Sequence, residues 1–125
     1  MTRLQHVNVV VPPGRTADLV AFYVDVLALQ QVPKPAALDP RGAWFQLGAG
    51  TQIHVSERDD AGGGSRDAHF ALVVDDFADV VRRITAAGAP WEDGPQIFGG
   101  GRGFTRDPLG NRIEVLENAG ALADP

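Results

Sequence analysis

Three histidines and one glutamate stand at related positions in two pairs of similar stretches of the chain. Residues 50–57 align without a gap with residues 110–117, which places His54 against Glu114, 60 residues later (114 − 54). His6 and His69 begin two further similar stretches, and with His54 they are all the histidines of the protein. Because an internal repeat fixes architecture, we interpret these four residues as matched positions in two repeated modules.

Strand periodicity places the same four residues on one type of surface. Side chains alternate across a strand, and strands are predicted over residues 4–11, 51–57, 68–74 and 111–117. In each strand the apolar residues share one face and the candidate residue lies on the other. We therefore predict metal ligands at His6, His54, His69 and Glu114.

Imidazole and carboxylate ligands suit a divalent ion such as zinc, nickel, cobalt, manganese or iron(II). A single histidine in a strand is more often structural than a ligand, but histidines with a structural role have no reason to follow a repeat. Glu114 is the only carboxylate of the set. It is therefore also the candidate catalytic residue, since it could carry a proton.

The elements that must position these residues have the same order in both halves. The first half predicts a strand, a helix over residues 17–29 with Thr16 as its N-cap, a short strand, and a hairpin of residues 43–47 and 51–57. The second predicts a strand, a helix capped by Asp76 and ending before Gly88, a short strand, and a hairpin of residues 102–106 and 111–117. This β-α-β-β-β order predicts an α+β fold.

Composition and glycine content set the domain organisation. The length of 125 residues suits one domain, which we assign to residues 1–120, with module one at 3–57, a linker at 58–67 and module two at 68–117. Residues 118–125 are predicted to be a tail. The Gly62–Gly64 run could be a phosphate loop, but no Lys-Ser/Thr pair follows it, and a linker is the favoured interpretation.

Charge and cysteine content exclude several classes. The net charge of −5 argues against nucleic acid as a partner. The absence of cysteine excludes disulfides and thiolate ligands. No apolar run is long enough to span a membrane, so we expect no membrane partner and a cytoplasmic protein.

The most specific stretch is residues 106–114, with its Asp-Pro-x-Gly-Asn-x-Ile-Glu turn and strand. Together with His6 and His69, it resembles the vicinal oxygen chelate superfamily, which includes glyoxalases, bleomycin resistance proteins, fosfomycin resistance proteins and extradiol dioxygenases. The resemblance covers residues 3–117. It implies a single glyoxalase-like domain in which two βαβββ modules form a curved, partly open mixed sheet around a central site. Members are commonly homodimers.

The resemblance also implies the chemistry. His6, His69 and Glu114 occupy the superfamily's regular ligand positions, whereas His54 stands where similar glyoxalases usually have a second Glu. We expect a metal-dependent enzyme acting on a small oxygenated metabolite or electrophile, with the metal as a Lewis acid that chelates substrate oxygens. The alternative is a non-catalytic drug-binding protein of the bleomycin-resistance type.

Five further side chains could contact a small-molecule substrate, among them an arginine that follows a glycine-rich loop and could bind an anionic group. The aromatic candidates could equally belong to the core, and the candidate arginine could be solvated. The predicted substrate-binding residues are Gln52, Trp44, Phe98, Arg102 and Phe104.

Overall fold

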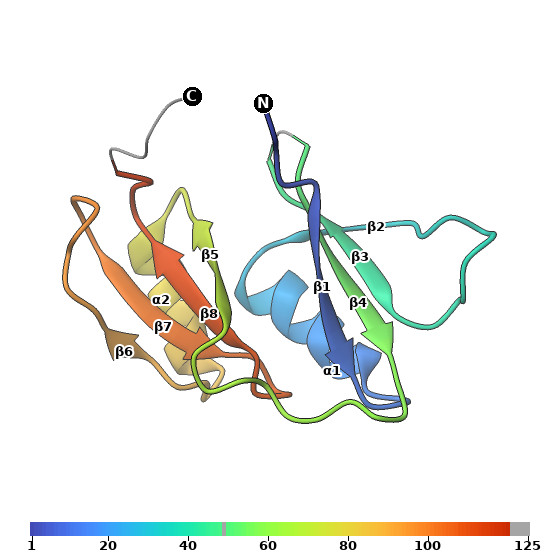
Figure 1. Ribbon diagram of the computed structural model, residues 1–125. Helices are drawn as coiled ribbons and strands as arrows, with labels where there is room; N and C mark the ends of the chain where they lie inside the picture. Colours follow the sequence, from blue (N-terminus) through green and yellow to red (C-terminus); the bar gives the residue numbers. More distant parts are fainter. Residues whose placement is uncertain (49, 121–125) are drawn as a thin grey trace. The chain divides into compact units, whose positions relative to one another are not determined.

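The computed structural model describes residues 1–48 and 50–120 and divides the chain into two compact units, Met1–Gly63 and Gly64–Pro125 (Figure 1). The division lies within the glycine-rich segment 58–67. Residues 121–125 of the predicted tail lie outside the described residues.

The first unit is a four-stranded sheet with helical segments on one face (Figure 1). Strand β1 is parallel to β4, and the other neighbours are antiparallel, in the order β1-β4-β3-β2. The elements are β1 (His6–Val11), α1 (Thr16–Ala21), the π-helix η1 (Phe22–Val26), β2 (Gln30–Val32), β3 (Ala43–Gln46) and β4 (Gln52–Glu57).

The second unit repeats this topology. Its sheet order is β5-β8-β7-β6, again with only the first pair parallel. The elements are β5 (His69–Val73), α2 (Phe77–Ala86), β6 (Glu92–Asp93), β7 (Arg102–Arg106) and β8 (Arg112–Leu116). The predicted α+β class and the two βαβββ modules are confirmed, and neither sheet is closed.

The helix boundaries agree with the sequence in the second unit and differ in the first. Asp76 accepts a hydrogen bond from the Asp79 N–H at 3.1 Å, and Gly88 follows the helix with a φ of 76°, as predicted. The N-cap prediction for Thr16 is wrong, because Arg15 holds that position. The Thr16 hydroxyl instead donates to Glu57 at 2.7 Å, a long-range partner that no local pattern reveals.

The strand faces alternate as expected. Ile53 and Val55 of β4 and Ile113 and Val115 of β8 are fully buried against the helical side of their sheets. Burying a branched side chain of this size contributes about 1.5–3 kcal/mol. This apolar packing fixes the register, because a shift of one residue would turn each strand over.

The end of the predicted linker is held against the second unit. A side chain at Gly64 would collide with the Gly110 carbonyl. Arg106 donates to the carbonyl oxygens of Ser65 and Arg66 at 3.0 and 2.9 Å. Residues 64–66 therefore pack beside the β7–β8 turn.

Candidate functional site

Strand pairing gives the two sheets matching polar faces. His54 lies opposite Trp44 on β3, and Glu114 lies opposite Phe104 on β7. Paired residues of neighbouring strands project to the same face. Each unit therefore carries an aromatic ring beside its central candidate ligand.

In the first unit, His54 is stacked between two rings. Its ring lies 3.8 Å from that of Trp44 at an interplanar angle of 2°, and 4.1 Å from that of His6 at 18°. The structure thus brings the two predicted ligands of this unit together. Their parallel rings keep the in-plane lone pairs from converging on one point, which does not fit joint coordination of one ion.

A chain of glutamine side chains fixes the tautomer of His54. The Gln46 amide nitrogen donates to the carbonyls of Leu47 and Thr51 at 2.8 and 3.2 Å. The Gln46 oxygen must then accept from the Gln52 nitrogen at 2.8 Å. The Gln52 oxygen consequently faces His54 Nε2 at 2.8 Å. Since that oxygen can only accept, Nε2 carries the hydrogen in the neutral ring and Nδ1 keeps the lone pair.

Burial lowers the pKa of His54, and the nearby charges of His6 and Lys34 act in the same direction. The neutral ring, with its acceptor at Nδ1, is therefore favoured. Gln52 was predicted to contact substrate; the structure shows it orienting His54.

In the second unit, His69 Nε2 lies 3.0 Å from Glu114 Oε1. His69 Nδ1 faces the carbonyl oxygen of Asp67 at 2.8 Å, so Nδ1 is the donor. The Nε2 lone pair and a carboxylate oxygen would repel each other unless a cation, either a proton or a metal ion, lies between them. Ligand atoms about 2.1 Å from an ion stand about 3 Å apart when they subtend a right angle at it, so this separation is compatible with metal coordination as well as with an ion pair to a protonated ring.

Arg102 and Phe104 complete the surroundings of Glu114. Arg102 Nε donates to Glu114 Oε2 at 2.9 Å, and only 15% of the Arg102 side chain is exposed. Arg102 is therefore an ion-pair partner rather than a solvated residue. Its guanidinium carbon lies 4.9 Å from the centre of the Phe104 ring and 6.0 Å from that of Phe98. Phe98, Phe104 and Trp44 are half-buried and lie outside the buried core.

Arg112 belongs to this cluster and was missed among the site residues. Its guanidinium carbon lies 3.8 Å from the centre of the Phe104 ring, a cation–π contact. The alternation of β8 already placed Arg112 on the face of Glu114, two residues before it, so the signal was present in the sequence.

Among residues 1–48 and 50–120, no group of three or more His, Cys, Asp or Glu side chains is arranged to hold a metal ion. Each unit instead brings together two of the four predicted ligands: His6 with His54, and His69 with Glu114.

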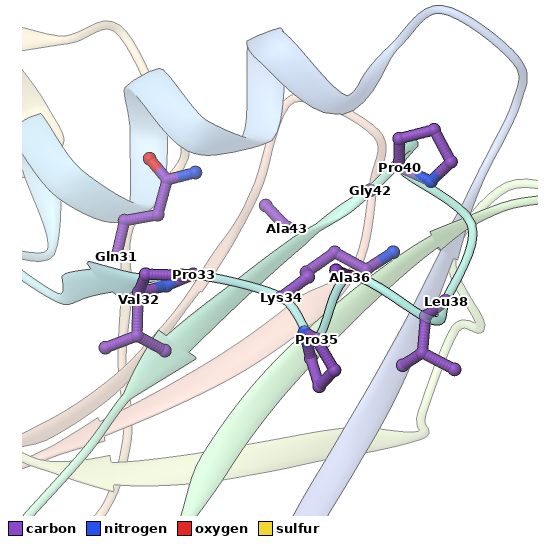
Figure 2. Close-up of a pocket in the computed structure, with 10 residues that line it drawn as sticks. All are labelled: Gln31, Val32, Pro33, Lys34, Pro35, Ala36, Leu38, Pro40, Gly42 and Ala43. Atoms are coloured by element: carbon purple, nitrogen blue, oxygen red, sulfur yellow. The ribbon is translucent and has the colours of Figure 1, made fainter.

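The first unit also contains two cavities beside the segment that joins β2 and β3. The larger, of about 340 Å³, is lined by Gln31, Val32, Pro33, Lys34, Pro35, Ala36, Leu38, Pro40, Gly42 and Ala43 (Figure 2). A second, of about 200 Å³, shares Lys34 and Leu38 and reaches Trp44 and His54. The Lys34 side chain crosses the loop (Figure 2) and donates to the carbonyls of Asp39 and Arg41.

The sequence matches the glyoxalase-like domain family over residues 8–116, most of the chain. The chain belongs to this family. A protein of Bacillus anthracis described as belonging to the glyoxalase family is 30% identical, with a TM-score of 0.84, and the match covers 94% of this chain and 96% of that one. The superfamily resemblance is thereby confirmed.

More distant glyoxalase-like structures share the fold. A lactoylglutathione lyase from Agrobacterium tumefaciens is 20% identical with a TM-score of 0.68, covering 92% of both chains. A fosfomycin resistance protein from Listeria monocytogenes is 17% identical with a TM-score of 0.72, covering 95% of this chain and 93% of that one. No curated protein gives a significant match.

Within the described residues, no helix has the length and apolar character needed to cross a membrane.

Proposed function

We propose that this glyoxalase-like chain is a divalent-metal-dependent enzyme acting on a small oxygenated metabolite or electrophile. The observation that carries the proposal is that an imidazole nitrogen and a carboxylate oxygen at two predicted ligand positions, His69 Nε2 and Glu114 Oε1, lie 3.0 Å apart. We propose these two side chains as ligands. The assignments of His6 and His54 as ligands remain predictions, and the stacked rings of that pair fit joint coordination poorly.

A bound divalent ion would supply Lewis acidity to adjacent oxygens of the substrate. The protein's own groups would do the rest. On leaving the ion, Glu114 Oε1 could take or return a proton, while the hydrogen bond from Arg102 to Oε2 keeps the carboxylate oriented. Arg112, stacked on Phe104, can attract a negatively charged group of the substrate.

Metal analysis tests this proposal. Protein purified without chelator should carry close to one divalent ion per chain. Adding zinc, nickel, manganese or iron(II) to metal-depleted protein should raise the melting temperature, because a ligand that binds only the folded state stabilises it. His69→Ala and Glu114→Gln should each weaken metal binding at least about tenfold. Glu92→Gln, an exposed carboxylate of the same unit, is the matched control.

Substoichiometric metal, with no change in melting temperature on metal addition, would contradict the proposal. Tight drug binding that survives His69→Ala and Glu114→Gln would instead favour a non-catalytic resistance protein. We also propose a homodimer, since superfamily members often form dimers. Light scattering on the eluting protein peak measures this directly.

A further inference from the structure

The smaller cavity of the first unit has room only for a ligand smaller than a drug-sized molecule. Its volume is about 200 Å³, below the range of about 300–1,000 Å³ typical of pockets for drug-sized ligands. It is lined by Asn8, Lys34, Leu38, Asp39, Arg41, Trp44, His54, Ser56, Glu57 and Arg58.

Two cations of the lining, Lys34 and Arg58, form no ion pair within the described residues, and they differ in exposure. Arg58 is exposed and donates to the Glu57 carbonyl, whereas Lys34 is half-buried. Asp39 forms a two-pronged ion pair with Arg41, and Glu57 accepts from Gly14 and Thr16. Lys34 donates to two backbone carbonyls, which are neutral, and in the described part of the chain it forms no ion pair. An ammonium group has three donors, so a charge and one N–H remain for a ligand.

His54 adds to the lining a hydrogen-bond acceptor that has no partner assigned to it so far. His54 borders the cavity, whereas Gln52, which holds its Nε2–H, does not. The ring atom of His54 that remains available to a ligand is therefore Nδ1. Its lone pair can accept a hydrogen bond from an O–H or N–H group of the ligand. Trp44, stacked on His54, holds the ring in place.

We propose that this cavity binds a small organic anion that also carries a hydroxyl or N–H group. Lys34 holds the anionic group, and His54 Nδ1 accepts a hydrogen bond from the ligand. This site lies within the first unit, and its binding is measurable on protein kept in EDTA, without the metal ion that the proposed function requires.

Three probes of similar size separate the two interactions. Lactate has both the charge and the hydroxyl, lactamide lacks the charge, and propionate lacks the hydroxyl. In nuclear magnetic resonance titrations of isotope-labelled protein in EDTA, lactate should bind at least about fivefold more tightly than either of the others. The amide signals that shift should be those of the lining residues.

Variants at Lys34 test the assignment. Lys34→Gln should lower the affinity for lactate to that for lactamide, while its amide N–H groups can still reach the loop carbonyls. Lys34→Arg should retain the preference for lactate. Arg15→Gln removes an exposed cation of the same unit outside the cavity and should bind lactate as the wild type does.

Equal affinities for the three probes would overturn the proposal. So would unchanged lactate binding by a folded Lys34→Gln protein, or shifts confined to residues outside the lining. These results leave the metal content of the protein untouched, so failure here and failure of the metal-dependent function are distinguishable.

Discussion

At the scale of single residues, hydrogen-bond direction decides what a candidate side chain can do. His54 is one of three histidines with a matched place in the repeat, yet its Nε2 is committed to Gln52. His69 presents Nε2 to Glu114 because the Asp67 carbonyl takes its Nδ1–H. The two imidazoles therefore offer different nitrogens to a ligand.

We predict that neutral His54 carries its hydrogen on Nε2. Long-range proton–nitrogen magnetic resonance should show a protonated Nε2 and an unprotonated Nδ1, because Gln52 can only accept at that contact. Gln52→Leu removes the acceptor and should give a mixture of tautomers. Gln5→Leu, which removes a hydrogen-bond partner of His6 instead, should leave the tautomer of His54 unchanged. A wild-type ring protonated on Nδ1 would refute the hydrogen-bond chain.

A second residue-scale prediction concerns Gly42, which lies between the Lys34 loop and β3. Its φ is 89°, and a Cβ there would collide with the Val55 carbonyl. Gly42→Ala should lower the unfolding free energy by about 2 kcal/mol or more, through backbone strain and the collision together.

Gly14→Ala is the matched control for that substitution. Gly14 has a similar φ of 80°, but a Cβ there meets nothing within 4 Å. Gly14→Ala should lower the unfolding free energy by about 1–2 kcal/mol, through backbone strain alone. Equal losses of unfolding free energy for the two variants in urea denaturation would show that residue 42 has more room beside β4 than the structure gives it.

At the scale of elements, the start of α1 is held by the end of β4. Glu57 accepts from the Gly14 N–H at 2.9 Å and from the Thr16 hydroxyl at 2.7 Å. These hydrogen bonds lower the pKa of Glu57, the one from Gly14 having the larger effect. A carboxylate from a distant strand therefore anchors the segment in which α1 begins, although it accepts from none of the first backbone N–H groups of the helix.

This arrangement predicts a pH-dependent contribution to stability. Because the folded-state pKa of Glu57 lies below its ordinary value of 4.5, the contribution is complete above that value and is lost as pH falls through the folded-state pKa. Glu57→Gln cannot ionise, so the stability difference from wild type should shrink on acidification. Urea unfolding measured from about pH 3 to about pH 7 checks this. A difference that is constant with pH, as we expect for the control Glu92→Gln, would contradict it.

At the scale of the whole molecule, each unit has its own apolar core. Ile53 and Ile113 are fully buried at corresponding positions of β4 and β8. Repetition of the same order of elements explains why both sheets have the same register and the same buried face.

Equivalent core positions should respond alike. We predict that Ile53→Ala and Ile113→Ala each cost about 2–5 kcal/mol, and that the corresponding Ile→Val changes cost about 0.5–1.5 kcal/mol. Urea denaturation of the four variants measures this. A cost below about 1 kcal/mol for either alanine variant would show that its unit is loosely packed.

The sequence determined the features that depend on local pattern and on repetition. The period of apolar residues indicated the strands and their buried faces. The internal repeat indicated two modules, and Asp76 and Gly88 marked the ends of α2. Alternation along β4 and β8 also placed His54 and Glu114 on the polar faces, because side-chain direction in a strand follows from position alone.

Only the tertiary structure decided which atoms meet. Thr16 donates to Glu57, Arg102 pairs with Glu114, and Gln46 and Gln52 select the tautomer of His54. Apart from the contact of Gln52 with His54 within β4, these contacts join groups on different strands, or on a strand and a helix, and all depend on distances of a few tenths of an ångström. Residue types and spacing limit the candidate partners, but hydrogen-bond direction requires the folded geometry.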